Sequence, residues 1–77
     1  MEMHSVISSN IKMVGWENKV LRIDFQSGGS YDYARVPEKI FTELMGAPME
    51  GISAGKYFHA NIKGKFKFKK RTIGELI

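Results

Sequence analysis

The sequence predicts an α+β domain in which a small antiparallel β-meander packs against two short helices. Three observations support this fold class. Apolar and polar residues alternate on both sides of the Gly-rich segment Ser27–Ser30, which is typical of a β-hairpin. Two later segments, 37–46 and 53–64, carry apolar residues at helical spacing. Alternation then returns in the sequence KFKFKKR, residues 65–71, which indicates a basic C-terminal strand or arm.

The length and composition predict one domain that spans 1–77, with a core over about 6–70. The 77 residues are 43% hydrophobic, which is enough for one core in a chain that buries roughly 60% of its unfolded surface. The absence of cysteine excludes a disulfide framework, a thiolate metal site and a cysteine nucleophile, and is compatible with the cytoplasm. The sequence has no apolar run near the roughly 18 residues of a membrane span, and its N-terminus has no signal-peptide pattern. We therefore expect no membrane partner.

The first strand is expected over Ile11–Gly15, after an extended lead-in over residues 1–10. The four residues Trp16–Lys19 then form a predicted turn, in which Asn18 can adopt the left-handed conformation.

The second and third strands flank the Gly-rich turn. The second, Val20–Gln26, is expected to turn Leu21, Ile23 and Phe25 inward, and the third covers Ser30–Val36. Tyr31 and Tyr33 share one face of the third strand. If that face is buried, their hydroxyl groups need partners at its rim; if it is open, the rings form a stacking platform like those of sheet-based RNA binders. The register across the hairpin decides, and the sequence leaves both alternatives open.

The first helix is expected to begin at Pro37, because proline lacks an N–H that the first helical turn does not use. Gly46 should end this helix, and Pro48 should prevent it from resuming. Its apolar stripe consists of Ile40, Phe41, Leu44 and Met45.

A linker, Met49–Ile52, is expected to lead to the second helix. Ser53 is a suitable N-cap for this helix. Gly64 is expected to end it, and its apolar stripe consists of Ala54, Tyr57, Phe58 and Ile62.

The C-terminal segment alternates again. Over 65–71, Phe66 and Phe68 should share one face of a strand, with the lysines on the other. The apolar residues of the tail 72–77 are expected to pack on the core or on a second subunit, which would make a homodimer; they are Ile73, Leu76 and Ile77.

One set of motifs resembles a known family. The order is a Tyr-x-Tyr followed by Val-Pro, and then Ser-x-Gly-x-Tyr-Phe; its residues are Tyr31, Tyr33, Val36, Pro37, Ser53, Gly55, Tyr57 and Phe58. This pattern resembles the KTSC domain, a small module of some lysyl-tRNA synthetases that also occurs as free-standing proteins of bacteria and phages. The resemblance covers residues 6–68. It implies little chemistry, because the family is treated as a domain of unknown function, with RNA binding suggested partly by its attachment to a synthetase.

The charge distribution favours an anionic partner. The chain carries 12 Lys and Arg against 8 Asp and Glu, and no acid lies between Glu50 and Glu75. Binding to single-stranded nucleic acid needs cations for the phosphates and flat side chains on which bases stack. The candidate binding residues are Tyr33, Lys56, Lys63, Lys65, Phe66, Lys67, Phe68, Lys69, Lys70 and Arg71. A purely structural role stays open for both sets of side chains: the aromatic ones can be core residues, and the lysines can protect an edge strand from aggregation.

The sequence offers no catalytic or metal-binding set. His4 and His59 are its two histidines, and general acid–base catalysis by His59 would need an orienting partner and a substrate pocket. No nucleophile triad, metal-ligand spacing or phosphate-cradling motif is present. We therefore expect no catalytic residue, no metal and no cofactor, and we interpret His59 as a surface or helix-packing residue.

The leading hypothesis is a non-catalytic, cytoplasmic domain of bacterial or phage origin that binds RNA or another nucleic acid. One alternative is a protein-interaction module or phage-encoded inhibitor that acts through an edge strand and the apolar tail. A second alternative is a small-nucleotide-binding protein that uses tyrosine, lysine and His59.

Overall fold

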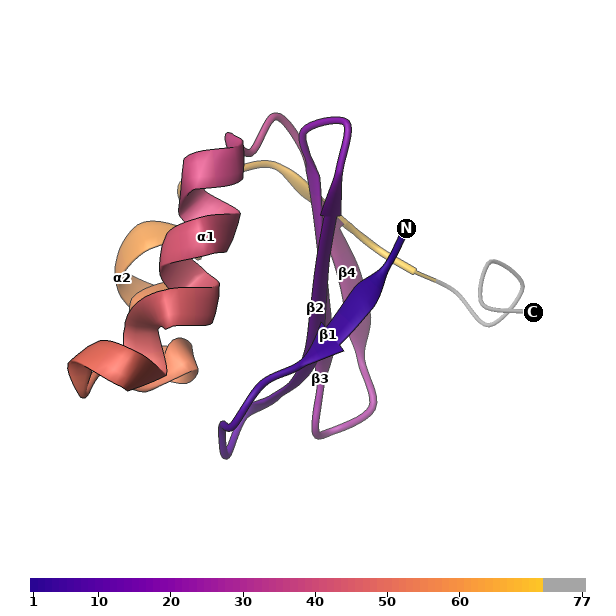
Figure 1. Ribbon diagram of the computed structural model, residues 1–77. Helices are drawn as coiled ribbons and strands as arrows, with labels where there is room; N and C mark the ends of the chain where they lie inside the picture. The colour runs from indigo at the N-terminus through magenta and orange to yellow at the C-terminus, as the bar shows by residue number, and fades with distance from the viewer. Residues whose placement is uncertain (72–77) are drawn as a thin grey trace.

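The computed structural model, which describes residues 1–71, has the predicted α+β fold (Figure 1). Five antiparallel strands form one sheet in the order β1-β2-β3-β4-β5; they are β1 (Met3–Ser5), β2 (Ile11–Glu17), β3 (Val20–Phe25), β4 (Ser30–Tyr33) and β5 (Phe68–Lys70). Helices α1 (Glu38–Gly46) and α2 (Ala54–Asn61) lie together on one face of this sheet, and the 3₁₀ helix η1 (Ala47–Glu50) connects them. Among the helices of residues 1–71, none has the length and apolar character needed to cross a membrane.

The predicted meander is confirmed, but the first hairpin is tighter than expected. Trp16, which we predicted in a turn, continues β2 and lies opposite Leu21. The turn consists of Asn18 and Lys19 alone, with φ values of 49° and 64°. Two consecutive positive φ angles are typical of a type I′ turn, whose twist matches that of the flanking strands. At this strand position, the indole N–H of Trp16 donates a hydrogen bond to the carbonyl of Val36 at 2.8 Å.

Strand β4 ends at Tyr33, three residues before the predicted end at Val36. Arg35 has a φ of 58°, which turns the chain out of the sheet direction. Val36 is then fully buried, and its N–H donates to the carbonyl of Lys19 at 2.8 Å. The sharp turn therefore brings the start of α1 back over the sheet.

The path between the two helices differs from the expected linker. Gly46 is the last residue of α1 but keeps right-handed dihedral angles, and the chain continues directly into η1. Pro48 is tolerated there because the first turn of a helix does not use its missing N–H. Gly51, with a φ of 80°, ends η1.

The sheet has one buried and one open face, and the register places the two tyrosines on the buried one. Tyr33 pairs with Leu21 and Tyr31 pairs with Ile23, and both aliphatic partners are fully buried beneath the helices. Directly opposite residues share a face, so the alternative of an open tyrosine platform is wrong. The largest fully buried side chains are Ile11, Val14, Leu21, Ile23, Val36, Leu44 and Ile62.

The basic C-terminal strand is confirmed in a shorter form. β5 begins at Phe68 and pairs with β4 at the edge of the sheet, with Tyr33 opposite Phe68 and Tyr31 opposite Lys70. Phe66 lies in a bend before this strand and packs, half-buried, against the core, so the expected alternation starts only at Lys67. The predicted packing of the tail falls on residues 72–77, outside the described residues.

The N-cap of α2 is confirmed and generates a prediction on stability. The Ser53 hydroxyl accepts a hydrogen bond from the backbone N–H of Lys56 at 3.1 Å. Replacing Ser53 by Ala removes this acceptor, so we expect S53A to lower the free energy of unfolding by about 1 kcal/mol. S53D keeps an acceptor at the cap and should retain most of the stability. Urea denaturation of the three proteins measures the difference; equal stability of S53A and the parent would contradict the capping role.

Candidate functional site

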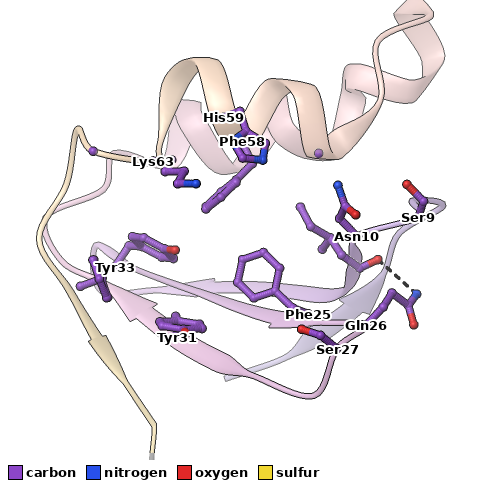
Figure 2. A pocket seen from close by; sticks show the side chains of 14 residues that line it. Ser9, Asn10, Phe25, Gln26, Ser27, Tyr31, Tyr33, Phe58, His59 and Lys63 are labelled. Atoms are coloured by element: carbon purple, nitrogen blue, oxygen red, sulfur yellow. Dashed lines mark hydrogen bonds between the residues drawn. The ribbon is translucent and has the colours of Figure 1, made fainter.

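An open cleft of about 570 Å³ lies between α2 and the strands below it (Figure 2). Its volume lies within the range of roughly 300–1,000 Å³ that is typical of small-ligand sites. Residues from the N-terminal segment, the start of β2, β3 and the turn after it, β4, β5, and α2 with the segment after it line the cleft; they are Ser9, Asn10, Ile11, Phe25, Gln26, Ser27, Tyr31, Tyr33, Gly55, Phe58, His59, Lys63, Gly64 and Phe68. The cleft therefore joins parts of the chain that are far apart in the sequence.

Five aromatic rings form the walls of this cleft. Phe58 reaches down from α2, with its ring centroid 5.4 Å from Phe25 and 5.7 Å from Tyr33. At the sheet edge, Phe68 lies 5.6 Å from Tyr31 and 5.7 Å from Tyr33. Edge-to-face contacts of this kind stabilise the arrangement of the rings. The result is a wall of flat apolar surfaces beside an open space.

Tyr33 lies at the bottom of the cleft, and this position corrects its predicted role. The residue is 5% exposed, so its ring is not available as an open stacking surface. Its hydroxyl forms no hydrogen bond with another residue of 1–71, and Figure 2 shows it turned toward the middle of the cleft, below Lys63. Burial raises the pKa of Tyr33 to about 12, with a smaller contribution from Tyr31. Tyr33 thus offers a neutral hydroxyl to the cleft.

One end of the cleft carries amide and hydroxyl groups that the sequence did not identify as functional. The side chain of Asn10 lies close against α2. A Cβ atom built on Gly55 would stand only 3.1 Å from the side-chain nitrogen of Asn10. The Asn10 amide forms no side-chain hydrogen bond within residues 1–71. The Gln26 amide, by contrast, donates to the carbonyl of Ile11 at 3.4 Å. The approach of Asn10 to Gly55 depends on the tertiary fold, and no local pattern could have revealed it.

The basic side chains of the cleft are Lys63 and His59. Lys63 follows the end of α2, and His59 lies four residues earlier on the same side of the helix. Neither forms an ion pair with an acid of residues 1–71, and no aspartate or glutamate lines the cleft. The cleft therefore favours an anionic ligand with a flat ring.

The motif residues separate into two groups. Tyr31, Tyr33, Gly55 and Phe58 line the cleft. The others build the scaffold around it: Val36 is in the core, Pro37 precedes α1, Ser53 caps α2, and the Tyr57 hydroxyl donates to Glu43 at 2.7 Å. The last contact joins α2 to α1, so the second group holds the helices in place above the cleft.

The predicted nucleic-acid-binding residues are only partly brought together. Lys63 and Phe68 line the cleft, whereas Lys56 lies in the first turn of α2, away from Lys63. The ring of Phe66 is half-buried against the core, and its role in stacking stays a prediction. The remaining cations follow the chain from the end of α2 along the sheet edge; they are Lys65, Lys67, Lys69, Lys70 and Arg71.

Along this edge, successive residues lie on opposite faces of the sheet. Lys67 and Lys69 alternate with Phe68 and line a second hollow of about 270 Å³ outside the cleft. Asp32 lies opposite Lys69 and forms a bidentate pair with Arg22, at 2.7 and 3.0 Å. Tyr33 and Phe68 line both hollows, so these two rings form the boundary between them.

Comparisons with known proteins agree with the fold and with the motifs. The family model of the KTSC domain matches residues 7–66. The crystal structure of a KTSC domain protein from Yersinia pestis superposes with a TM-score of 0.81 at 34% identity, over 92% of this chain and 97% of that one.

The curated relatives are much longer proteins. A lysine–tRNA ligase of Nostoc punctiforme is 43% identical over 63 residues, which are 79% of this chain and 10% of the ligase. A lysine–tRNA ligase of Trichormus variabilis is 45% identical over 51 residues, 66% of this chain and 8% of the ligase. The chain thus spans about a tenth of the length of the relatives that it matches.

The buried tyrosines predict how stability depends on pH. Burial raises the pKa of both Tyr33 and Tyr57 to about 12, with a further contribution at Tyr57 from its hydrogen bond to Glu43. In the unfolded chain both ionise near pH 10. Their stabilising effect is therefore complete below about pH 10 and is lost as the pH rises through about 12, since the unfolded chain releases these protons first. We expect the free energy of unfolding to fall over this interval, and Y33F to reduce the fall. Urea denaturation at a series of pH values measures both; identical profiles for the parent and Y33F would contradict the burial effect.

Proposed function

The chain belongs to the KTSC domain family, and from this premise we propose that it is a non-catalytic domain that binds RNA or another single-stranded nucleic acid. The observation that carries the proposal is the position of the basic arm, residues 63–71, beside an aromatic cleft without acids. Cations in a row and flat side chains next to them are the two components of single-strand binding.

The arm offers cations that no acid neutralises. Lys63, Lys65 and Lys67 are exposed and form no ion pair with the acids of residues 1–71. By contrast, Lys39 on α1 lies 3.7 Å from Glu43. Protection of the edge strand alone would need few charges, because β5 has three residues. The excess of cations supports contact with phosphates.

Phe68 supplies a stacking surface at the arm. Its side chain is 60% exposed although it contacts the rings of Tyr31 and Tyr33. An exposed ring that is fixed by neighbouring rings gives a base a rigid surface on which to stack. A single-stranded nucleic acid that follows the arm would thus pass Phe68 and reach the cleft.

The relatives add a functional association. The curated proteins that carry a similar segment are named lysine–tRNA ligases. The name of these ligases includes tRNA, so a domain that contacts RNA would be compatible with their name. The present chain spans about a tenth of those proteins, so the association supports RNA as partner and does not extend the ligase reaction to this chain.

A second candidate function, protein binding, has one observation in its favour. β5 is the last strand of the sheet, and its outer edge pairs with no strand within residues 1–71. An extended peptide could add there as a further strand. Such binding depends mainly on backbone hydrogen bonds, so it would respond weakly to salt, unlike contacts with phosphates.

Substitution of two arm lysines tests the proposed function. K65Q together with K67Q removes two charges and leaves the paired backbone in place. Each lost phosphate contact should reduce the slope of log affinity against log salt by about 0.7, and the pair by about 1.4. We expect affinity for a single-stranded RNA oligomer to fall roughly tenfold at low salt. Fluorescence anisotropy at several salt concentrations measures both effects.

The matched control removes the same charge elsewhere. K12Q with K39Q lowers the net charge equally at exposed positions outside the arm and the cleft. It should leave the salt slope nearly unchanged. Equal losses in both double variants, or no RNA binding by the parent at low salt, would overturn the proposed function.

A further inference from the structure

The two ends of the cleft carry different polar groups. The Lys63 cation and the His59 imidazole lie where α2 ends, and the aromatic walls follow below them. The amide of Asn10 and the hydroxyl of Ser27 lie at the other end, as Figure 2 shows. A ligand that fits this order has an anionic group, a flat ring and polar atoms on the edge of the ring.

The hydroxyl of Tyr33 is the polar group at the bottom of the cleft. The residue is 5% exposed, and its hydroxyl, which bonds to no residue of 1–71, is turned into the cleft. Among the described residues, no buried side-chain oxygen or nitrogen lacks a partner, so this hydroxyl is open to the cleft and can bond to a ligand there. Tyr57 shows the contrast, since its hydroxyl donates to Glu43 at 2.7 Å.

Asn10 provides a second unpaired group. Its side-chain amide carries both donors and an acceptor and bonds to no residue of 1–71. Gly55 allows this amide to lie close against α2, where a larger residue would crowd it. Donors and an acceptor at the end of an aromatic cleft can bind the edge of a heterocyclic base.

We propose that this cleft binds one nucleotide, with the base between the aromatic walls, its edge at Asn10, and the phosphate at Lys63 and His59, near the hydroxyl of Tyr33. The proposal rests on the proposed function and deepens it, because the arm continues from Lys63 along the sheet edge. The nucleotide is then the end of a strand whose other phosphates lie along the arm. A free nucleotide presents the same chemistry, so the experiment separates the two sources.

The experiment uses AMP, CMP, GMP and UMP as probes, each titrated into the full chain while backbone amide resonances are followed by NMR. We expect at least one nucleotide to shift the resonances of Asn10, Gly55 and Lys63 together. The corresponding nucleoside should bind about tenfold more weakly, since it lacks the charge-assisted contacts of the phosphate. Inorganic phosphate alone should bind more weakly still, because it cannot use the aromatic walls.

Two pairs of variants locate the contacts. Y33F removes the cleft hydroxyl, whereas T42V removes an exposed hydroxyl on α1, outside the cleft; we expect roughly fivefold weaker nucleotide binding for Y33F and no change for T42V. K63Q removes the cleft cation, whereas K39Q removes one on α1; K63Q should weaken binding of the nucleotide about tenfold and leave the nucleoside unaffected. Equal effects within either pair would overturn the assignment of that contact to the cleft.

Competition with RNA distinguishes failure of this inference from failure of the proposed function. If a mononucleotide shifts the cleft resonances and displaces an RNA oligomer, both proposals are supported and the strand end is the source. If mononucleotides bind while RNA does not, the cleft proposal holds with a free nucleotide as its ligand, and the RNA function is overturned. If RNA binds through the arm while no mononucleotide shifts the cleft resonances, the cleft proposal is overturned and the RNA function stands.

Discussion

The contact of Phe58 with the sheet is the interaction on which the candidate site depends. Helix α2 has eight residues, and an isolated helix of that length is unstable in water, so tertiary packing must hold it. Phe58 provides this packing through edge-on contacts with Phe25 and Tyr33, each at an interplanar angle of 72°. The same ring separates α2 from the strands and leaves the cleft beside it. The core and the cleft therefore share one side chain, and neither can be changed independently.

Local patterns predicted the elements whose formation depends on neighbours in the sequence. Alternation located β3 and the hairpin to β4, and Ser53 with the apolar residues that follow it located α2. The same reasoning was wrong for Trp16, because its strand position depends on a partner twenty residues later, the carbonyl of Val36. β2 shows another limit. A register shift between Ile11 and Met13 lets both Ile11 and Val14 face the core, which a strict period of two does not allow.

The cleft could be predicted only in part, since its geometry depends on contacts between distant segments. The lysine and aromatic content of residues 63–71 is visible in the sequence, and it identified Lys63 and Phe68. The position of Asn10 against Gly55 is not, because forty-five residues separate them and the α1–η1–α2 path decides where Gly55 lies. The question of which face the tyrosines occupy needed the register of β3 with β4. Motif residues thus marked the cleft without revealing its shape.

The distribution of aromatic side chains also bears on whether the cleft has a function. A domain of 77 residues has little apolar surface to bury, so each large ring that stays exposed reduces its stability. Phe68 nevertheless stands 60% exposed on an edge strand, beside Tyr33, whose hydroxyl faces the cleft and bonds to no residue of 1–71. Selection for stability alone would favour a polar residue at position 68, and it gives no reason for a hydroxyl group at position 33. Both departures lie at the same cleft, next to the cations of the arm, and a ligand with a flat ring and a phosphate would satisfy them together.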